Sequence, residues 1–289
     1  MIKEKTSLST GLFDQTFKED NPELYWIFQI SESDISYTLL DTSSNTFIGL
    51  QKCSWDNKLA HQSAAERQLS EVLPDLAFLP NSSQKSLFSI NNEVYTIIPK
   101  SLFEKNQLEN YLKLNFSAEK LENTIPHAQL VESIQAYIVY AVPMYIQETI
   151  QQKFDHLKFS HHTSSLIEMN LLRHSKESML SINMKDAAFD LYGQNEGHFS
   201  YMNSFSYASA EDVVYYLLYV MEQLELDRNS IEISLYGEIE ENSQVYELLF
   251  TYLKNVRLGG QIHQMNYSPV LQKIQTHHHY SLFSQYLCV

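Results

Sequence analysis

The hydrophobic and polar positions of the chain follow one pattern twice. Residues 27–50 and residues 178–202 each alternate apolar and polar side chains, and polar turns interrupt the alternation at two places. Alternation of this kind is typical of half-buried strands, so each segment predicts three strands joined by two turns. A shift of 152 positions aligns the segments without a gap and places Asp34 opposite Asp186. The pattern therefore predicts an internal duplication.

Between the two copies the pattern predicts further strands. Residues 86–90 and 93–98 flank two asparagines, a combination that favours a β-hairpin. The continuous apolar run at 136–143 predicts a buried strand that ends in proline. A shorter apolar run at 166–172 is a strand candidate that leads into the second copy.

Helix signals follow the second copy. Ser209 and Asp212 have the spacing of a capping box before an apolar helix that runs to about residue 226. Ser243 begins another helix, whose apolar stripe extends to Val256 and stops at the glycine pair 259–260. A helix is also expected from residue 63, and a short one at the C-terminus. Strands that alternate with helices indicate an α/β architecture.

Composition narrows the class of protein. The chain has 289 residues, 44% of them apolar, which is enough for a core in one large or two medium domains. A net charge of −15 argues against nucleic acid and against anionic membrane surfaces as partners. No apolar run is long enough to span or enter a membrane, and two cysteines, Cys53 and Cys288, predict packed thiols instead of a disulfide framework. We therefore expect a cytoplasmic protein.

The order of elements resembles a known superfamily. A three-strand meander followed by helix, strand and helix, present twice, is similar to the actin, Hsp70 and sugar-kinase superfamily. Residues 139–143, Val-Tyr-Ala-Val-Pro before a helix, resemble the turn that precedes the second phosphate loop in the Hsp70 branch. The whole chain, including its ending at 278–288, also resembles an uncharacterised bacterial family with an actin-like ATPase fold.

The resemblance implies a fold and a domain plan. It implies two actin-like (ribonuclease H-like) α/β domains, each with the meander, helix, strand and helix unit, around a cleft that holds ATP in the superfamily. We expect a flexible N-terminus at 1–20, a first domain at 21–135 and a second at 136–289. In this plan the C-terminal segment can pack back on the first domain.

The residues that carry the superfamily's chemistry are missing. That chemistry needs Asp-x-Gly at the end of the first strand of each half, because the carboxylate organises the metal and the glycine lets main-chain amides approach phosphate. A Gly-Gly turn holds the adenosine. The corresponding cleft-lining positions here are Gln29 and Ser31, Ser181 and Asn183, and Gly237 and Glu238. Glu238, with Glu240 and Glu241, would place negative charge beside a nucleotide.

Two interpretations of function remain. The first is a non-catalytic protein that keeps the actin-like scaffold, binds no cofactor or metal and acts through contacts with an unknown protein partner. The alternative is a divergent nucleotide-binding protein, ATPase or kinase that uses Ser31, Asn183, Asp186 and Gly237 in the same cleft. No P-loop or dinucleotide-binding motif offers another phosphate site.

The remaining candidate groups favour structural roles. His156, His161 and His162 fit no standard zinc spacing and are interpreted as surface histidines. The run of histidines at 277–279 is expected to begin a helix or to lie in a partner-facing loop. Asp34 and Asp186 could be paired carboxylates, but residues of this type bind local main chain in turns, and we favour that role. Many of the 19 tyrosines are expected in the core, although some could form a contact patch.

Overall fold

The computed structural model divides the chain into two compact units. It describes residues 8–15, 18, 21–31, 33–55, 69–77, 79–80, 84–154, 157–174 and 176–289. Unit 1 comprises Met1–Ser164, His263–Ile274 and Cys288–Val289, and unit 2 comprises Ser165–Ile262 and Gln275–Leu287. Most of the helix expected from residue 63 lies outside the described residues. The domain limits drawn from the sequence, 21–135 and 136–289, stay a prediction.

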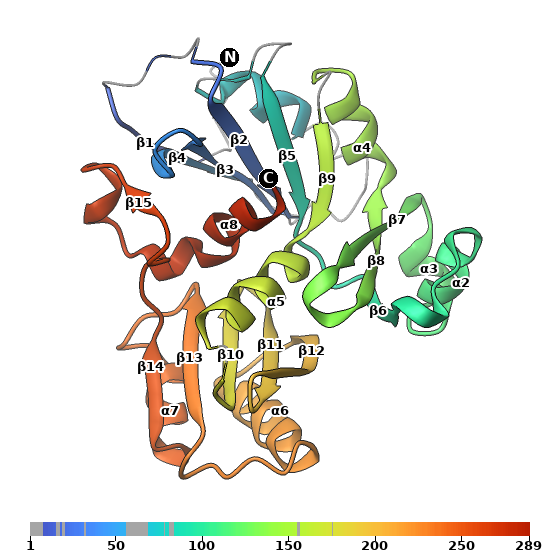
Figure 1. Cartoon of the computed structure of the whole chain (residues 1–289), viewed down its shortest axis with the longest axis vertical. Helices are drawn as coiled ribbons and strands as arrows, with labels where there is room; N and C mark the ends of the chain where they lie inside the picture. Colours follow the sequence, from blue (N-terminus) through green and yellow to red (C-terminus); the bar gives the residue numbers. More distant parts are fainter. Residues whose placement is uncertain are drawn as a thin grey trace, which may run out of the picture. The chain divides into compact units, whose positions relative to one another are not determined.

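Unit 1 is built on a seven-stranded sheet (Figure 1). Its strands are β1 Leu8–Phe13, β2 Leu24–Ile30, β3 Asp34–Asp41, β4 Thr46–Ser54, β5 Lys85–Ile90, β9 Leu157–His161 and β15 Asn266–Tyr267. The order is β1-β4-β3-β2-β5-β9, and β15 pairs with β4. Every residue of β2 is buried, as the near-continuous apolar sequence of a central strand requires.

The N-terminal segment differs from its expectation as a flexible tail. Leu8–Phe13 forms β1, which pairs antiparallel with β4 from Ser54 to Gly49. Pairing of this kind depends on main-chain hydrogen bonds, which a polar sequence forms as well as an apolar one.

A three-stranded sheet is inserted between β5 and β9. Its order is β6-β8-β7, and its elements are β6 Tyr95–Pro99, α2 Leu108–Lys113, α3 Ala118–Leu121, β7 Thr124–Val131 and β8 Ala136–Pro143, followed by α4 Met144–Gln151. The run 136–143 is therefore a strand, as predicted. The expected hairpin is wrong, because β5 pairs with β2 and β9 whereas β6 pairs with β8. Asn92 redirects the chain, since its amide donates to Ala141 O and its side-chain oxygen accepts from Val94 N.

Unit 2 is built on a five-stranded sheet in the order β12-β11-β10-β13-β14. Its elements are β10 Met179–Met184, β11 Ala188–Asn195, β12 His198–Ser206, α6 Ala210–Gln223, β13 Glu232–Gly237, α7 Gln244–Tyr252, β14 Asn255–Leu258 and α8 Tyr280–Ser284. Helices α6 and α7 lie against this sheet (Figure 1), and their buried apolar side chains form one core cluster with those of its strands. The capping box at Ser209 is present, but α7 ends at Tyr252, and Val256 belongs to β14.

The short apolar run at 166–172 forms a helix and not a strand. It lies in α5, His162–Arg173, which begins in unit 1 and ends in unit 2. Periodicity alone cannot separate a buried helix from a buried strand in so short a run. The complete element has 12 residues, a length that is typical of a helix and longer than that of most strands. No helix in the described part of the chain is both long and apolar enough to span a bilayer.

The two sheets repeat one topology, with a correction to the alignment. The order β4-β3-β2-β5-β9 in unit 1 matches β12-β11-β10-β13-β14 in unit 2. Ile30 pairs with residues on β3 and β5 as Met184 pairs with residues on β11 and β13, so the first two strands correspond at a shift of 154 positions. Each copy also has a bulge in its second strand, after Leu39 and after Gly193. Only the third strands keep the shift of 152, because the turn before them is two residues shorter in unit 2.

Candidate functional site

The turn after β2 in unit 1 is closed by its own first side chain. Ser31 Oγ accepts hydrogen bonds from the main-chain N–H of Ser33 at 3.2 Å and of Asp34 at 3.0 Å. The Ser31 N–H in turn donates to Asp34 O at 2.9 Å. Gln29 lies in β2 and is buried. Two main-chain amides of this turn are thus already bonded to a serine hydroxyl.

The corresponding turn in unit 2 is Lys185 to Ala187, between β10 and β11. The shift of 154 makes Asn183 the counterpart of Gln29 and Lys185 the counterpart of Ser31. Ser181, which the gapless alignment placed at this site, lies farther back in β10 and pairs with Tyr192. Both copies therefore carry an amide side chain at the same point, two residues before the turn.

A buried carboxylate organises this end of unit 2. Asp190, on β11, is 1% exposed and accepts from Asn183 Nδ2 at 3.1 Å and from Ser204 Oγ at 2.6 Å. Lys185 Nζ lies 2.8 Å from Asp190 Oδ1 and forms an ion pair with it. A buried charge is retained only when it is paired and hydrogen-bonded, and these three partners meet that requirement. Sequence reasoning missed Asp190, although a lone carboxylate inside an otherwise uncharged strand is a signal for such a cluster.

The turn after β13 lies against the end of β10. Gly237 has φ +80°, and a Cβ added there would lie 2.0 Å from Met184 O. The N–H of Glu238 donates to the same carbonyl at 2.9 Å, while the Glu238 side chain is exposed. Tyr207 donates to Lys185 O, and burial together with the charges of Asp186 and Glu238 raises the pKa of its hydroxyl. Glycine at 237 is thus explained by close main-chain packing.

The C-terminal histidines of unit 2 bind the same turn. His277 Nε2 lies 3.0 Å from Ile239 O, and His278 Nε2 lies 3.3 Å from it and 3.2 Å from Glu240 Oε1. They belong to a 3-10 turn, Thr276–His279, that leads into α8, so the predicted helix start is present. The C-terminal segment of unit 2 therefore contacts Ile239 and Glu240, the two residues that follow the positions expected to hold adenosine.

His277 is expected to make folding stability depend on pH. Burial lowers its pKa below the value of about 6.5 that it has in the unfolded chain. The unfolded state then binds more protons, so this contribution to stability is complete above about pH 6.5 and is lost as the pH falls through the folded pKa. Urea unfolding of His277→Gln should show a weaker pH dependence between neutral and acid pH, by at most about 1.4 kcal/mol per pH unit. The matched variant His198→Gln, at an exposed position of β12, should keep the wild-type dependence, and equal slopes for all three proteins would contradict the prediction.

Comparison with known proteins places the chain in a family. The family model described as "Protein of unknown function (DUF3822)" matches residues 14–256. The chain belongs to the DUF3822 family. A protein with an actin-like ATPase fold and unknown function from Bacteroides thetaiotaomicron VPI-5482 is similar over 87% of this chain and 95% of its own, with 21% identity and a TM-score of 0.74. The DUF3822 chain therefore has the actin-like ATPase fold that the sequence predicted.

A second structure supports the fold at greater distance. A chain of the PilM–PilN type IV pilus biogenesis complex is similar over 90% of the DUF3822 chain and 97% of its own, with 9% identity and a TM-score of 0.61. No curated protein matches the sequence. The identity of the pilus complex chain to this chain is low enough that the likeness concerns fold alone.

The central histidines of the DUF3822 chain are buried, which corrects their interpretation as surface residues. His161 and His162 are 0% exposed, and their rings lie 4.5 Å apart. His161 Nδ1 lies 2.8 Å from Thr163 Oγ1, and its Nε2 lies 3.2 Å from Asn92 Oδ1. Because that amide oxygen can only accept, the proton of a neutral His161 sits on Nε2 and Thr163 donates to Nδ1. His156 lies outside the described residues.

The other candidates do not form a shared centre. Asp34 and Asp186 are not equivalent at the corrected shift; Asp34 begins β3 within 3.8 Å of Lys52, and Asp186 is exposed in its turn. In the described ranges, no group of three or more His, Cys, Asp or Glu residues has the arrangement of a metal site. Cys53 and Cys288 are buried thiols, as expected.

Proposed function

We propose that this protein is a non-catalytic member of the actin-like fold that acts through protein–protein contacts. The observation that carries the proposal is the internal bonding of the turns that the fold would offer to phosphate. In unit 1 the amides of Ser33 and Asp34 bond to Ser31 Oγ, and in unit 2 the ammonium group of Lys185 bonds to Asp190. A phosphate would have to displace these partners, and neither turn has a glycine that would let it approach the main chain.

The amide side chains at Gln29 and Asn183 support the same proposal. Divalent cations such as Mg²⁺ are held through carboxylate oxygens, and a neutral amide offers no charge for this purpose. Asn183 is also committed to Asp190 through its amide nitrogen. A carboxylate in place of Asn183 would face that of Asp190 at about the same separation, and like charges so close repel strongly.

The turn after β13 adds a third reason. Glu238, Glu240 and Glu241 are exposed there, so the turn presents negative charge to a ligand that is itself an anion. Ile239 O, on the same turn, accepts hydrogen bonds from the C-terminal histidines of unit 2. A nucleoside at this turn would compete with the chain's own segment.

Contacts with another protein are supported by exposed aromatic side chains. On α6 and α7, Tyr215, Tyr219, Phe250 and Tyr252 are each close to half or more exposed, at 65%, 52%, 47% and 47%. Tyr and Phe are enriched where protein surfaces meet. The PilM–PilN complex shows that a similar fold occurs inside a protein assembly, which makes a role of this kind compatible with the architecture.

Nucleotide binding provides the test. We expect the thermal melt of the purified protein to stay unchanged in millimolar Mg-ATP or Mg-ADP, and no ATP hydrolysis above the buffer rate. A ligand at 100 times its Kd adds about 2.7 kcal/mol, which would raise the melting temperature by several degrees. An actin-like ATPase melted in the same buffers controls for the nucleotide stocks. A clear upward shift, or hydrolysis that scales with protein concentration, would refute the non-catalytic proposal.

A further inference from the structure

The outward face of α6 carries two aromatic side chains that do not belong to the core. Tyr215 and Tyr219 are one helical turn apart and are 65% and 52% exposed, while Val213 and Leu217 fill the core from the opposite face. The two rings are nearly parallel, at 17°, with centroids 6.5 Å apart. The Tyr215 and Tyr216 rings also meet edge to face, with their centroids 5.4 Å apart. Rings held in this way lose little freedom when a partner covers them.

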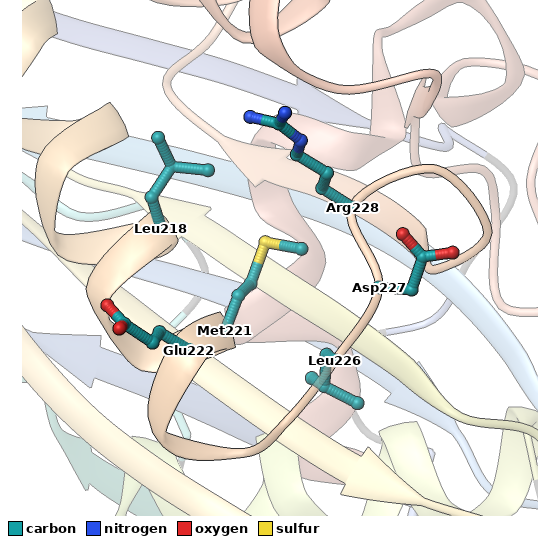
Figure 2. Close-up of a pocket in the computed structure, with 6 residues that line it drawn as sticks. All are labelled: Leu218, Met221, Glu222, Leu226, Asp227 and Arg228. Atoms are coloured by element: carbon teal, nitrogen blue, oxygen red, sulfur yellow. The ribbon is translucent and has the colours of Figure 1, made fainter.

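An open pocket lies at the C-terminal end of α6, and Glu222, three residues after Tyr219, lines it. Its volume is about 320 Å³, and it is lined by Leu218, Met221, Glu222, Leu226, Asp227 and Arg228. Figure 2 shows that the first three residues come from the last turns of the helix and the others from the loop that follows. Two leucines line the pocket together with charged residues. A pocket of this kind suits an apolar side chain of a partner that has charged neighbours.

The charge of this face is mainly negative. Glu211 and Glu222 are exposed on the same stripe of α6 as the two tyrosines. At the pocket, hydrogen bonds from Asn229 lower the pKa of Asp227, so its carboxylate is ionised at neutral pH. Arg228 is the only cation among the six lining residues. With a net charge of −15 on the chain, the electrostatic complement of this face is a basic surface.

Arginine fits the combination of rings and carboxylates better than lysine. Its planar guanidinium stacks on aromatic faces and pairs with a carboxylate through two parallel hydrogen bonds. The spacing of Tyr215, Tyr219 and Glu222 along one helix face offers both kinds of contact within two turns. An apolar residue next to such an arginine could enter the pocket between Leu218 and Leu226.

We propose that the outward face of α6, defined by Glu211, Tyr215, Tyr219, Glu222 and the pocket at Leu218 and Leu226, binds an arginine-containing basic segment of a partner protein. This inference rests on the proposed function, since it names the surface and the partner class for the protein contacts. Arginine side chains lie over the two tyrosine rings and pair with Glu222, and an adjacent apolar side chain occupies the pocket.

Peptide binding tests the inference. The probe is a short fluorescent peptide of alternating arginine and leucine, and the measurement is anisotropy at about 0.15 M salt, where nonspecific attraction is screened beyond about 8 Å. We expect Tyr215→Gln/Tyr219→Gln and, separately, Glu222→Gln to weaken binding by roughly tenfold. The matched variant Phe250→Gln/Tyr252→Gln, with two similarly exposed aromatic residues on α7, should bind as the wild type does.

Three outcomes would overturn the inference. They are absence of binding by the wild type, equal binding by the wild type and the α6 tyrosine variant, and equal losses in the α6 and α7 variants. A peptide with glutamate in place of arginine should not bind, and binding of that peptide would also count against it. The Mg-ATP experiment uses no peptide, so the two proposals can fail separately. If the wild type does not bind the peptide and its melting temperature does not change in Mg-ATP, only this inference is refuted. If Mg-ATP raises the melting temperature and the peptide still binds, only the proposed function is refuted.

Discussion

Replacing Asp190 by alanine is expected to destabilise the protein by about 3–5 kcal/mol, the range measured when one partner of a buried ion pair is removed. The carboxylate is 1% exposed, and its removal leaves the ammonium group of Lys185, with a side chain only 17% exposed, without its counterion. Asn183 Nδ2 and Ser204 Oγ lose their acceptor at the same time. Urea unfolding followed by circular dichroism measures the change.

Two variants make the Asp190 result specific. Arg257→Gln breaks an ion pair with Glu232 in the same sheet, where the side chains are 55% and 35% exposed, and should cost less than about 1 kcal/mol. Adding Lys185→Met to Asp190→Asn removes both charges and should recover part of the loss caused by Asp190→Asn alone. A cost below about 1 kcal/mol for Asp190→Ala would show that the cluster does not hold unit 2 together.

Gly237→Ala is expected to cost about 3 kcal/mol or more. The residue has φ +80°, a conformation that costs an L side chain roughly 1–2 kcal/mol. The new Cβ would also lie 2.0 Å from Met184 O and 2.7 Å from Met184 N, so the turn must move away from β10 and weaken the hydrogen bond from Glu238 N. The free energy of unfolding in urea and the melting temperature should both fall.

Gly260→Ala is the matched control for Gly237. A Cβ at position 260 meets no atom within 4 Å, so the change should stay within about 0.5 kcal/mol of the wild type. Equal effects of the two substitutions would mean that the turn after β13 accommodates a side chain. Glycine would then be retained at position 237 for a reason other than packing.

Local patterns predicted the elements that carry strong periodic signals. The two meanders, β2 to β4 and β10 to β12, lie where alternating residues indicated them. The capping box at Ser209 marks the start of α6, because its hydroxyl and the Asp212 carboxylate satisfy main-chain amides that a helix leaves open. The residues that form such signals lie close together in the sequence, so the signals can be recognised without knowledge of the rest of the fold.

The candidate site was less predictable, because it depends on pairing between distant strands. The gapless alignment placed Ser181 at the turn of unit 2, whereas the registers of β10 with β11 and β13 place Asn183 and Lys185 there. The error of two residues came from the shorter turn before β12. A shift of two preserves the inward and outward faces of a strand, so hydrophobic alternation could not reveal it.

Burial of polar groups was the other feature that local sequence did not reveal. His161 and His162 resemble surface residues in the sequence, but Asn92 and Thr163, which bond to His161, come from a loop after β5 and from the start of α5. Residues 86–98 have the sequence pattern of a hairpin, but β5 pairs with β2 and β6 pairs with β8. In both cases a partner far away in the chain decided the outcome.

The sequence by itself determined the class of fold, the duplicated meander and the main amphipathic helices, because each is a property of residue type and local spacing. Only the tertiary structure decided which residues stand at the turns, that Asp190 and Lys185 form a buried pair, and that Gly237 lies against Met184. The physical reason is that hydrogen bonds, charge pairs and close main-chain contacts of this kind depend on strands brought together across the sheet.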